Sequence, residues 1–202
     1  MSDQISQAPR FCEFCGGLLI LHCHGRQLPR RLTCIACHRI AYGSPSLLVS
    51  AYIFAENRLL LMRRGLAPYE GCWAPPAGFV EAGESLDNAI SREVSEEVGL
   101  CLPPEHYVPL GIISLPSINQ VYVNFFVRLE RCANLSAAYP EALAANWFLE
   151  NEYPVSDMWE PATADDVKWL FALGRTGRFE FFQQTERQHR RLPAFIELTK
   201  TP

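Results

Sequence analysis

The pattern of hydrophobic and polar residues along the chain predicts a series of short strands interrupted by two helices. Alternating or continuous apolar stretches bounded by turn residues favour strands at 47–55, 59–63, 107–115, 120–130 and 146–149. The third and fourth of these are expected to form a long hairpin around 116–119. Two prolines limit 73–80 to short extended pieces.

Residues 85–98 carry the clearest helical period. Its apolar residues recur at helical spacing and form one stripe, made of Leu86, Ile90, Val94 and Val98. Ser85 is placed to cap this helix, and Gly99 is placed to end it. A second helix is predicted at 165–173, with Thr163 as its cap and Gly174 as its stop. The aromatic and charged tail from Arg175 onward indicates no particular element.

The composition is that of an ordinary globular protein and excludes a disordered chain, a collagen-like repeat and a coiled coil. Of the 202 residues, 49% are hydrophobic and 20% are charged. The uncharged apolar stretch 46–55 is much shorter than the roughly 18 residues of a membrane span, so no membrane association is expected. Because the first ten residues contain no apolar signal region, we expect a cytoplasmic protein.

Charge is unevenly distributed along the chain. The net charge of −4 argues against a general nucleic-acid coat protein, which would be basic. Residues 1–43, however, carry five basic and two acidic residues, so a small basic segment precedes an acidic body. The Gly/Ser/Pro residues at 42–46 mark the expected boundary between the two.

Four of the eight cysteines form two Cys-x-x-Cys pairs, with 18 residues between the pairs: Cys12, Cys15, Cys34 and Cys37. This spacing is typical of a four-cysteine zinc site, in which two tight turns complete a tetrahedron. So short a segment cannot bury a useful core, so a metal would supply its folding energy. Disulfides, an iron site of the same shape, or a chance arrangement are the alternatives. A closed four-cysteine site leaves no open position for catalysis.

Three glutamates lie close to the apolar stripe of the first predicted helix. Glu97 falls inside the edge of the stripe, Glu93 just outside it, and Glu96 further round. Carboxylates at this spacing repel one another and need a compensating cation, of which Arg92 supplies one. Mg2+ prefers such oxygen ligands and usually also holds substrate phosphates. The alternative is an ordinary glutamate-rich helix on the protein surface.

The same stretch resembles the Nudix box, G-x5-E-x7-R-E-U-x-E-E-x-G-U, where U is aliphatic. Every specified position is met, by Gly78, Glu84, Arg92, Glu93, Val94, Glu96, Glu97, Gly99 and Leu100. The preceding Trp73-Ala-Pro-Pro-Ala-Gly-Phe-Val-Glu81 resembles the W-x-L-P-G-G-F-V-E segment common in the family. It departs from that segment at Pro75 and Ala77, which leaves the carboxylates unchanged.

The resemblance implies an α/β fold, namely a Nudix α/β/α sandwich with a mixed sheet, preceded here by the small zinc ribbon. It also implies Mg2+- or Mn2+-dependent hydrolysis of a nucleoside diphosphate linked to another group. Glu93 and Glu97 would bind the metal directly, and Glu96 would be a further ligand or assist the attacking water. Gly78 would offer its carbonyl. Glu84 with Arg92 would fix the geometry of the helix.

A general base outside the helix is also consistent with the family, since some members use a glutamate in a late loop. Glu141, just before the predicted strand at 146–149, is the candidate. A second glutamate often found three residues further on is Ala144 here, which leaves that role in doubt. The alternative for Glu141 is a solvated loop residue.

A Nudix domain directly behind a four-cysteine ribbon resembles two groups. One comprises the NADH pyrophosphatases, which also remove NAD caps from RNA, but their S-Q-P-W-P-F-P-x-S segment is absent from 101–124. The other comprises shorter proteins related to plant FAD and ADP-ribose pyrophosphatases, whose segments resemble 76–78 and 115–122. Pro116, placed 16 residues after the box, also occurs in ADP-ribose enzymes. We therefore expect ADP-ribose or FAD, with NADH or NAD-capped RNA as the alternative.

Four side chains are candidates for substrate binding. Arg63 and Arg64 end a strand directed at the site and could contact phosphate, while Trp73 or Tyr122 could stack on a base. A surface arginine and a core aromatic are the respective alternatives. A non-catalytic nucleotide sensor, or a ribbon that contacts RNA weakly through its positive charge, is the second class of function. The family resemblance also implies a homodimer.

The expected domain organisation has four parts. Residues 1–9 form a flexible N-terminus, 10–43 the zinc ribbon, 44–175 the Nudix hydrolase domain, and 176–202 a C-terminal extension. The remaining cysteines (Cys23, Cys72, Cys101 and Cys132) show no metal spacing and are expected to be ordinary thiols.

Overall fold

The computed structural model describes residues 10–23, 30–159, 163–185 and 188–197. The expected flexible segment 1–9 therefore lies outside the described residues. The chain divides into two compact units, residues 1–45 and residues 46–202. Each unit has its own sheet.

The N-terminal unit is a small antiparallel sheet with strand order β1-β2-β3. Its strands are β1 (Leu19–His22), β2 (Arg31–Cys34) and β3 (Ile40–Ala41). The first two pair along their whole length, and Leu19 lies opposite Cys34 in their register. The buried hydrophobic cluster among the described residues here consists of Cys12, Leu19 and Cys34. The cysteines thus form most of this unit's core.

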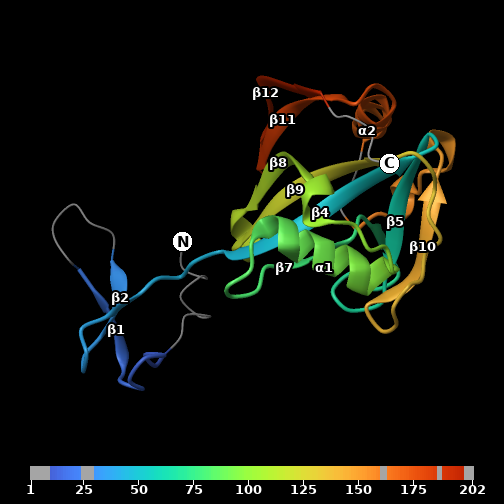
Figure 1. Cartoon of the computed structure of the whole chain (residues 1–202). Coiled ribbons are helices and arrows are strands. Elements are labelled where there is room, and N and C mark those ends of the chain that lie inside the picture. Colours follow the sequence, from blue (N-terminus) through green and yellow to red (C-terminus); the bar gives the residue numbers. More distant parts are fainter. Residues whose placement is uncertain (1–9, 24–29, 160–162, 186–187, 198–202) are drawn as a thin grey trace. The chain divides into compact units, whose positions relative to one another are not determined.

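The second unit is built on a mixed sheet that contains nine strands within the described residues. Seven lie in the order β10-β5-β4-β9-β8-β11-β12, while β6 pairs with β5 and β7 with β4 (Figure 1). The pairs β4–β9 and β8–β11 are parallel. The strands of this sheet that precede residue 150 are β4 (Ser46–Ala55), β5 (Arg58–Arg64), β6 (Trp73–Ala74), β7 (Ala77–Phe79), β8 (Val108–Leu115), β9 (Gln120–Leu129) and β10 (Ala142–Phe148).

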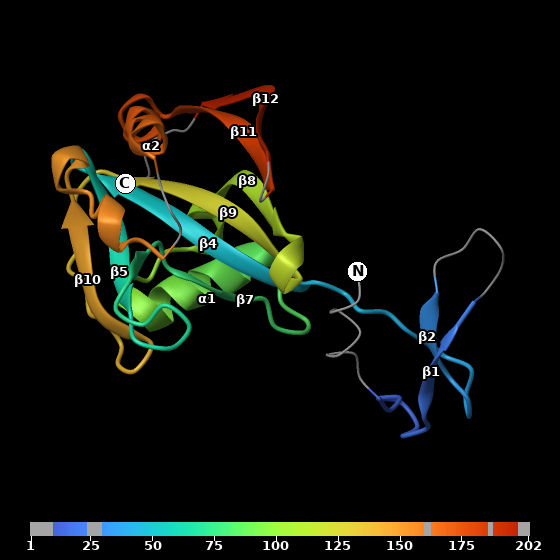
Figure 2. The ribbon, with the colours of Figure 1, turned by 180° about the vertical axis from the view of Figure 1, so that it is seen from behind.

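Two helices of 13 residues cover opposite faces of this sheet: α1 (Leu86–Val98) and α2 (Ala164–Thr176) (Figures 1 and 2). Apolar residues of α1 pack on one face and those of α2 on the other, in two separate core clusters. The α/β/α sandwich is therefore confirmed. Short 3-10 helices occur at η2 (Pro104–His106), η3 (Pro116–Ile118), η4 (Glu150–Glu152) and η5 (Val155–Asp157). Among the described residues, no helix is long and apolar enough to cross a bilayer.

The ends of the helices follow the sequence signals in three cases out of four. Gly99 ends α1 with a φ of 71°, and the Thr163 hydroxyl accepts a hydrogen bond from the Asp166 N–H. Ser85 stands at the N-cap of α1, but its hydroxyl accepts from the Asn88 amide rather than from the backbone. The expected stop at Gly174 is wrong, because α2 continues to Thr176 and Gly177 ends it at φ 68°.

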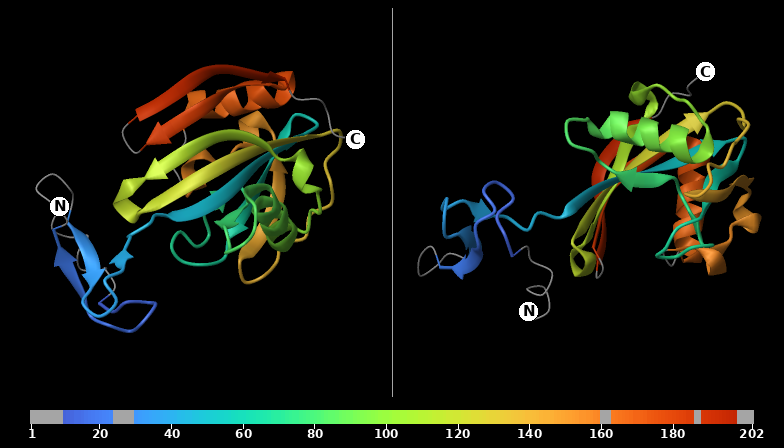
Figure 3. Two further views of the ribbon diagram at one scale, coloured as in Figure 1. Left: turned by 60° about the vertical axis from the view of Figure 1, so that its left-hand side comes forward. Right: turned by 90° about the horizontal axis from the view of Figure 1, so that it is seen from below.

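Gly174 permits close packing of α2 on the sheet and does not form a turn. A Cβ at this position would lie 2.2 Å from the ring of Phe54 on β4, so only glycine lets α2 approach the sheet this closely. The tail that the pattern left unassigned forms β11 (Arg178–Thr185) and β12 (Gln188–Glu197), an antiparallel pair. β11 continues the main sheet beside β8 (Figure 3). These two strands are thus part of the same sheet.

Candidate active site and metal-binding clusters

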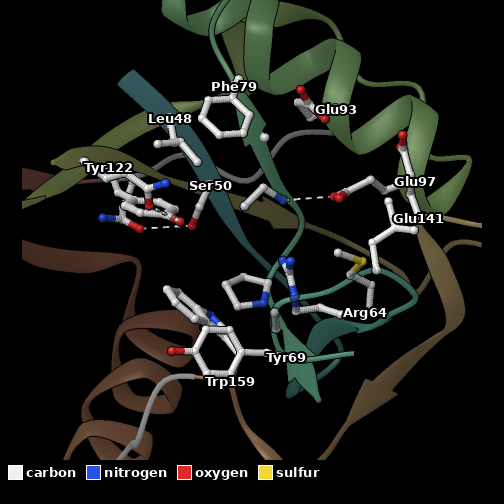
Figure 4. A pocket seen from close by; sticks show the side chains of 18 of the residues that line it. Leu48, Ser50, Arg64, Tyr69, Phe79, Glu93, Glu97, Tyr122, Glu141 and Trp159 are labelled. Atoms are coloured by element: carbon white, nitrogen blue, oxygen red, sulfur yellow. Dashed lines mark hydrogen bonds between the residues drawn. The ribbon is translucent and has the colours of Figure 1, made fainter. Parts of the chain in front are cut away.

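A cavity of about 700 Å3 opens in the second unit between the sheet, the start of β7 and helix α1 (Figure 4). One side carries carboxylates from α1 and from the segment before β10. The other side carries aromatic and apolar side chains from β4, β8, β9 and two loops. The lining residues used below are Ser50, Arg64, Tyr69, Gly78, Phe79, Arg92, Glu93, Glu96, Glu97, Ile118, Tyr122, Asn124, Glu141 and Trp159.

Two of the α1 carboxylates are buried at the inner side of the helix. Glu93 is 9% exposed and Glu97 is 5% exposed, and both belong to the buried face of α1. A Glu97 carboxylate oxygen accepts a hydrogen bond of 2.9 Å from the Ala77 N–H. Burial nevertheless dominates and raises the pKa of Glu97 to about 8, and it raises the pKa of Glu93 as well. Both sites therefore favour a nearby positive charge.

Arg92 ties the loop before the helix to the helix itself. Its guanidinium lies 2.8 Å from Glu84, 2.8 Å from Glu93 and 3.1 Å from Glu96. It also donates a 3.0 Å hydrogen bond to the Phe79 carbonyl. Hydrogen bonding from Arg92 lowers the pKa of Glu84, which in turn accepts from the Glu81 N–H. Arg92 and Glu84 thus fix the loop–helix geometry, while Glu96 remains half exposed.

Gly78 lets the backbone of β7 pass directly against the Glu93 carboxylate. A Cβ at Gly78 would lie 2.0 Å from the carboxyl carbon of Glu93. This contact is the physical reason for a glycine at the first position of the motif. It places the backbone of Gly78 beside the same carboxylates that are candidates for a metal.

The donor set at this end of the cavity suits a hard divalent cation. Glu141, directly before β10, faces the cavity, and its charge contributes to raising the pKa of both Glu93 and Glu97. Arg64, the last residue of β5, partly opposes that effect on Glu97. The charged side chains that line the cavity are five carboxylates, Glu81 included, and two guanidinium groups, so negative charge and oxygen ligands are in excess. The residues present therefore fit Mg2+ or Mn2+.

The predicted substrate-binding residues separate into two pairs. Arg64 and Tyr122 line the cavity. Arg63 and Trp73 are absent from its lining: Arg63 Nε donates to the Gly71 carbonyl at 2.8 Å, and the Trp73 ring packs edge-on against Phe148 at 4.9 Å. Adjacent residues of a strand face opposite sides of a sheet, so Arg63 and Arg64 diverge.

Sequence reasoning missed an aromatic group on the far side of the cavity. Trp159 lies 5.8 Å from Tyr69 and 6.0 Å from Tyr122, measured between ring centroids. Beside Tyr122, the Ser50 hydroxyl donates to the Asn124 side-chain carbonyl at 2.9 Å. These residues come from widely separated segments and share no motif. The only signal in the sequence was an aromatic residue, Tyr69, directly after Pro68 in a segment bounded by glycines.

The four cysteines of the N-terminal unit form a compact cluster whose sulfurs all lie within 4.8 Å of one another. The Sγ atoms of Cys12 and Cys37 are 3.8 Å apart, and those of Cys15 and Cys34 are 3.5 Å apart. With Zn–S bonds of about 2.3 Å, a tetrahedral site puts its sulfurs roughly 3.8 Å apart. The cluster thus fits zinc.

Comparison with known proteins agrees with this geometry. The sequence profile of the NUDIX domain matches residues 45–170, and the chain belongs to this family. A solved NUDIX hydrolase from Nitrosomonas europaea superimposes with a TM-score of 0.76 at 31% identity, covering 88% of this chain and 98% of that one. Fold, motif and relatives thus agree on membership of the Nudix family.

Two groups of curated relatives differ in what they match. An ADP-ribose pyrophosphatase from Methanocaldococcus jannaschii is 41% identical over 75 residues, covering 37% of this chain and 43% of the relative. The NAD-capped RNA hydrolase NudC from Vibrio cholerae is 30% identical over 155 residues, covering 75% of this chain and 54% of the relative. The chain spans about half the length of these curated relatives.

Proposed function

We propose that the protein hydrolyses the pyrophosphate bond of a nucleoside diphosphate derivative, most simply ADP-ribose or FAD, with Mg2+ or Mn2+. The observation that carries this proposal is the pair of buried glutamates at one end of a nucleotide-sized cavity, Glu93 beside Arg92 and Glu97 beside the Ala77 N–H. Two carboxylates are costly to bury without a cation, so a catalytic metal explains their position. The ADP-ribose pyrophosphatase among the relatives supports the substrate class.

We assign metal binding, positioning, proton transfer and phosphate binding to different residues of the cavity. Bound through Glu93, Glu96, Glu97 and the Gly78 carbonyl, Mg2+ or Mn2+ would neutralise phosphate charge and lower the pKa of an attacking water. Arg92 and Glu84 hold the helix and the loop before it in register. Glu141 faces the same space and is our candidate for accepting the proton of the water. Arg64 is our candidate for binding a phosphate oxygen, since its guanidinium has the geometry for it.

A second candidate substrate is NAD-capped RNA or NADH. It is favoured by the NudC relative, whose match extends over three quarters of the chain. The basic N-terminal unit also carries exposed aromatic rings beside arginines, with Arg39 3.6 Å above Phe14 and Arg31 4.8 Å above Tyr42. Such pairs are typical of surfaces that contact single-stranded nucleic acid. RNA binding to this unit would weaken steeply as salt is raised.

We further propose that Cys12, Cys15, Cys34 and Cys37 hold one structural zinc and that residues 10–43 form the ribbon, with catalysis confined to the Nudix domain. Their spacing in sequence and the sulfur–sulfur distances support this. A homodimer is proposed from the family resemblance. Metal analysis and light scattering coupled to size-exclusion chromatography test these two points.

The decisive experiment is a substrate panel with Mg2+ and with Mn2+. ADP-ribose, FAD, NADH, coenzyme A, diadenosine polyphosphates and an NAD-capped RNA are compared by kcat/KM. Highest efficiency on ADP-ribose or FAD supports the main proposal, and highest efficiency on NADH or capped RNA replaces it with the alternative. No metal-dependent turnover of any of them would overturn the proposal. Glu105→Gln, at an exposed position outside the cavity, serves as the matched control for carboxylate variants.

A further inference from the structure

The cavity is chemically divided, and the proposed reaction explains only one of its two ends. Carboxylates and arginines gather at α1 and β5, where the phosphates would lie. The opposite end is formed by Tyr69, Tyr122 and Trp159, which have no part in metal binding or proton transfer (Figure 4). Figure 4 shows Arg64 between the Glu97 end and the Tyr69–Trp159 pair.

Side chains at the aromatic end are exposed in a way that packing does not require. Tyr69 is 55% exposed, Tyr122 and Trp159 are partly exposed, and all three line the cavity. Large apolar groups gathered around a cavity mark a ligand-binding surface rather than a core. The three rings offer a planar ligand a broad apolar wall.

Trp159 is held in this position by the backbone rather than by its own burial. The backbone N–H of Trp159 donates a 3.0 Å hydrogen bond to the Trp73 carbonyl, and the preceding Met158 forms an isolated parallel β-bridge with Trp73. The indole is therefore presented to the cavity from a fixed point beside β6. Trp73, which the sequence suggested as a stacking residue, supports the segment that carries Trp159.

The floor beside these rings has an unsatisfied polar group. Asn124 is 1% exposed, and its side-chain nitrogen has no hydrogen-bond partner among the described residues. Its side-chain carbonyl is already occupied by the Ser50 hydroxyl. A buried donor without a partner is costly, and a ring nitrogen or carbonyl of a ligand is the kind of acceptor that would satisfy it.

We propose that Tyr69, Tyr122 and Trp159 form the subsite for the planar heteroaromatic ring of the substrate, with Asn124 recognising its polar edge. The inference deepens the proposed function and rests on it only for the placement of the pyrophosphate at the glutamates. A ring held at one end and phosphates at the other make the enzyme selective for nucleoside diphosphate derivatives over sugar diphosphates. Base stacking, rather than phosphate binding alone, then sets the affinity.

Binding of AMP and of ribose 5-phosphate, measured by calorimetry without added Mg2+, tests the subsite without relying on hydrolysis. The full chain is expected to prefer AMP. Trp159→Ala is expected to weaken AMP binding by about tenfold to a hundredfold and to leave ribose 5-phosphate binding within about twofold. Trp159→Phe, which keeps a ring, restores most of the AMP affinity. Asn124→Ala weakens AMP binding by a smaller factor.

Trp169→Phe is the matched control, because Trp169 packs against Phe182 and lies outside the cavity lining. AMP is expected to change the tryptophan fluorescence of the full chain and of Trp169→Phe, but not that of Trp159→Phe. With ADP-ribose, Trp159→Ala raises KM and leaves kcat nearly unchanged.

Equal binding of AMP and ribose 5-phosphate to the full chain, or unchanged AMP affinity in Trp159→Ala, would overturn the subsite. These outcomes are distinct from failure of the proposed function. If the chain binds AMP through Trp159 but hydrolyses no member of the substrate panel, the subsite stands and the hydrolase proposal falls. If the full chain and Trp159→Ala hydrolyse ADP-ribose with equal KM and kcat, the hydrolase proposal stands and the subsite falls.

Discussion

The cysteine cluster of the N-terminal unit and the glutamates of α1 are both candidate metal ligands, but they stand in different relations to their cores. In the first unit, Cys12 and Cys34 are themselves the buried residues, together with Leu19. In the second, Glu93 and Glu97 lie at the edge of a core that α1 and the sheet complete without them. The first metal would hold a fold together, whereas the second would act on a fold already made.

The two clusters also differ in how they leave room for chemistry. Four sulfurs within 4.8 Å of one another enclose a tetrahedral ion completely. The carboxylates of α1 instead line an open cavity that continues to an aromatic wall. A closed site serves stability, and an open site can bind substrate oxygens. Changes to the closed site should therefore affect stability, and changes to the open site should affect turnover.

Cys34→Ser is expected to abolish zinc binding and with it the order of β1–β3, since structural zinc supplies on the order of 10 kcal/mol in small ribbons. The second unit should keep its melting transition because its core does not include the cysteines. Zinc content and amide exchange of residues 19–41 measure the effect. Cys23→Ser, at an exposed cysteine outside the cluster, is the control and should retain one zinc per chain. Unchanged amide protection of β1–β3 in Cys34→Ser would contradict a role of the metal in holding this unit together.

Glu97→Gln is expected to lower kcat by about a thousandfold while the fold survives, because it removes one charged ligand and no core packing. Its melting temperature without added metal should be equal to that of the wild type or higher, because the neutral amide removes the cost of keeping a carboxyl group buried with a raised pKa. Steady-state hydrolysis and thermal melts measure the two effects. Near-normal turnover in this variant, with Glu105→Gln also normal, would refute the role of Glu97.

Gly78→Ala is expected to reduce kcat/KM by about a hundredfold, because a Cβ would displace the Glu93 carboxylate from its present position. Displacing that carboxylate should also weaken the activation by Mg2+. Titration of activity with Mg2+ measures this shift. Gly43→Ala, where a Cβ would contact nothing within 4 Å, is the matched control and should behave as the wild type.

The smallest effect concerns pH and the stability of the second unit without added Mg2+. Burial raises the pKa of Glu97 from 4.5 to about 8, so the folded chain retains a proton that the unfolded chain releases. Stability should therefore fall as pH rises through this window. Saturating Mg2+ should flatten the dependence, as should Glu97→Gln. Thermal melts across the window check both, and a stability that rises with pH in the absence of Mg2+ would show the sign to be wrong.

Local patterns predicted much of the fold and of the metal-binding end of the site. The stripe Leu86–Val98 placed Glu93 and Glu97 at the buried edge of α1 and Glu96 further out, and their burial agrees with this. The Cys-x-x-Cys pairs likewise predicted a cluster that the sheet of β1 and β2 brings together. Both predictions concern residues a few positions apart on one element or turn.

Other features depended on contacts between distant segments and could not be predicted. The end of α2 was predicted too early. Gly174 is a glycine because it packs against the Phe54 ring on β4, and the local sequence does not distinguish this from a helix stop. The β11 strand was not predicted because its partner is β8, about seventy residues earlier in the sequence. Arg63 and Trp73 lie outside the cavity lining because strand pairing decides which side of β5 and β6 each side chain occupies.

The sequence by itself determined the type of chemistry, because helical and turn geometry fix the spacing of ligands that are close in the chain. It specified two sets of candidate metal ligands, the loop–helix that carries one of them, and the family to which the chain belongs. The tertiary structure alone decided what surrounds the carboxylates. The sheet and its loops bring Tyr69, Tyr122 and Trp159 to one wall and turn Trp73 away, since that wall depends on strand register and loop anchoring over ninety residues.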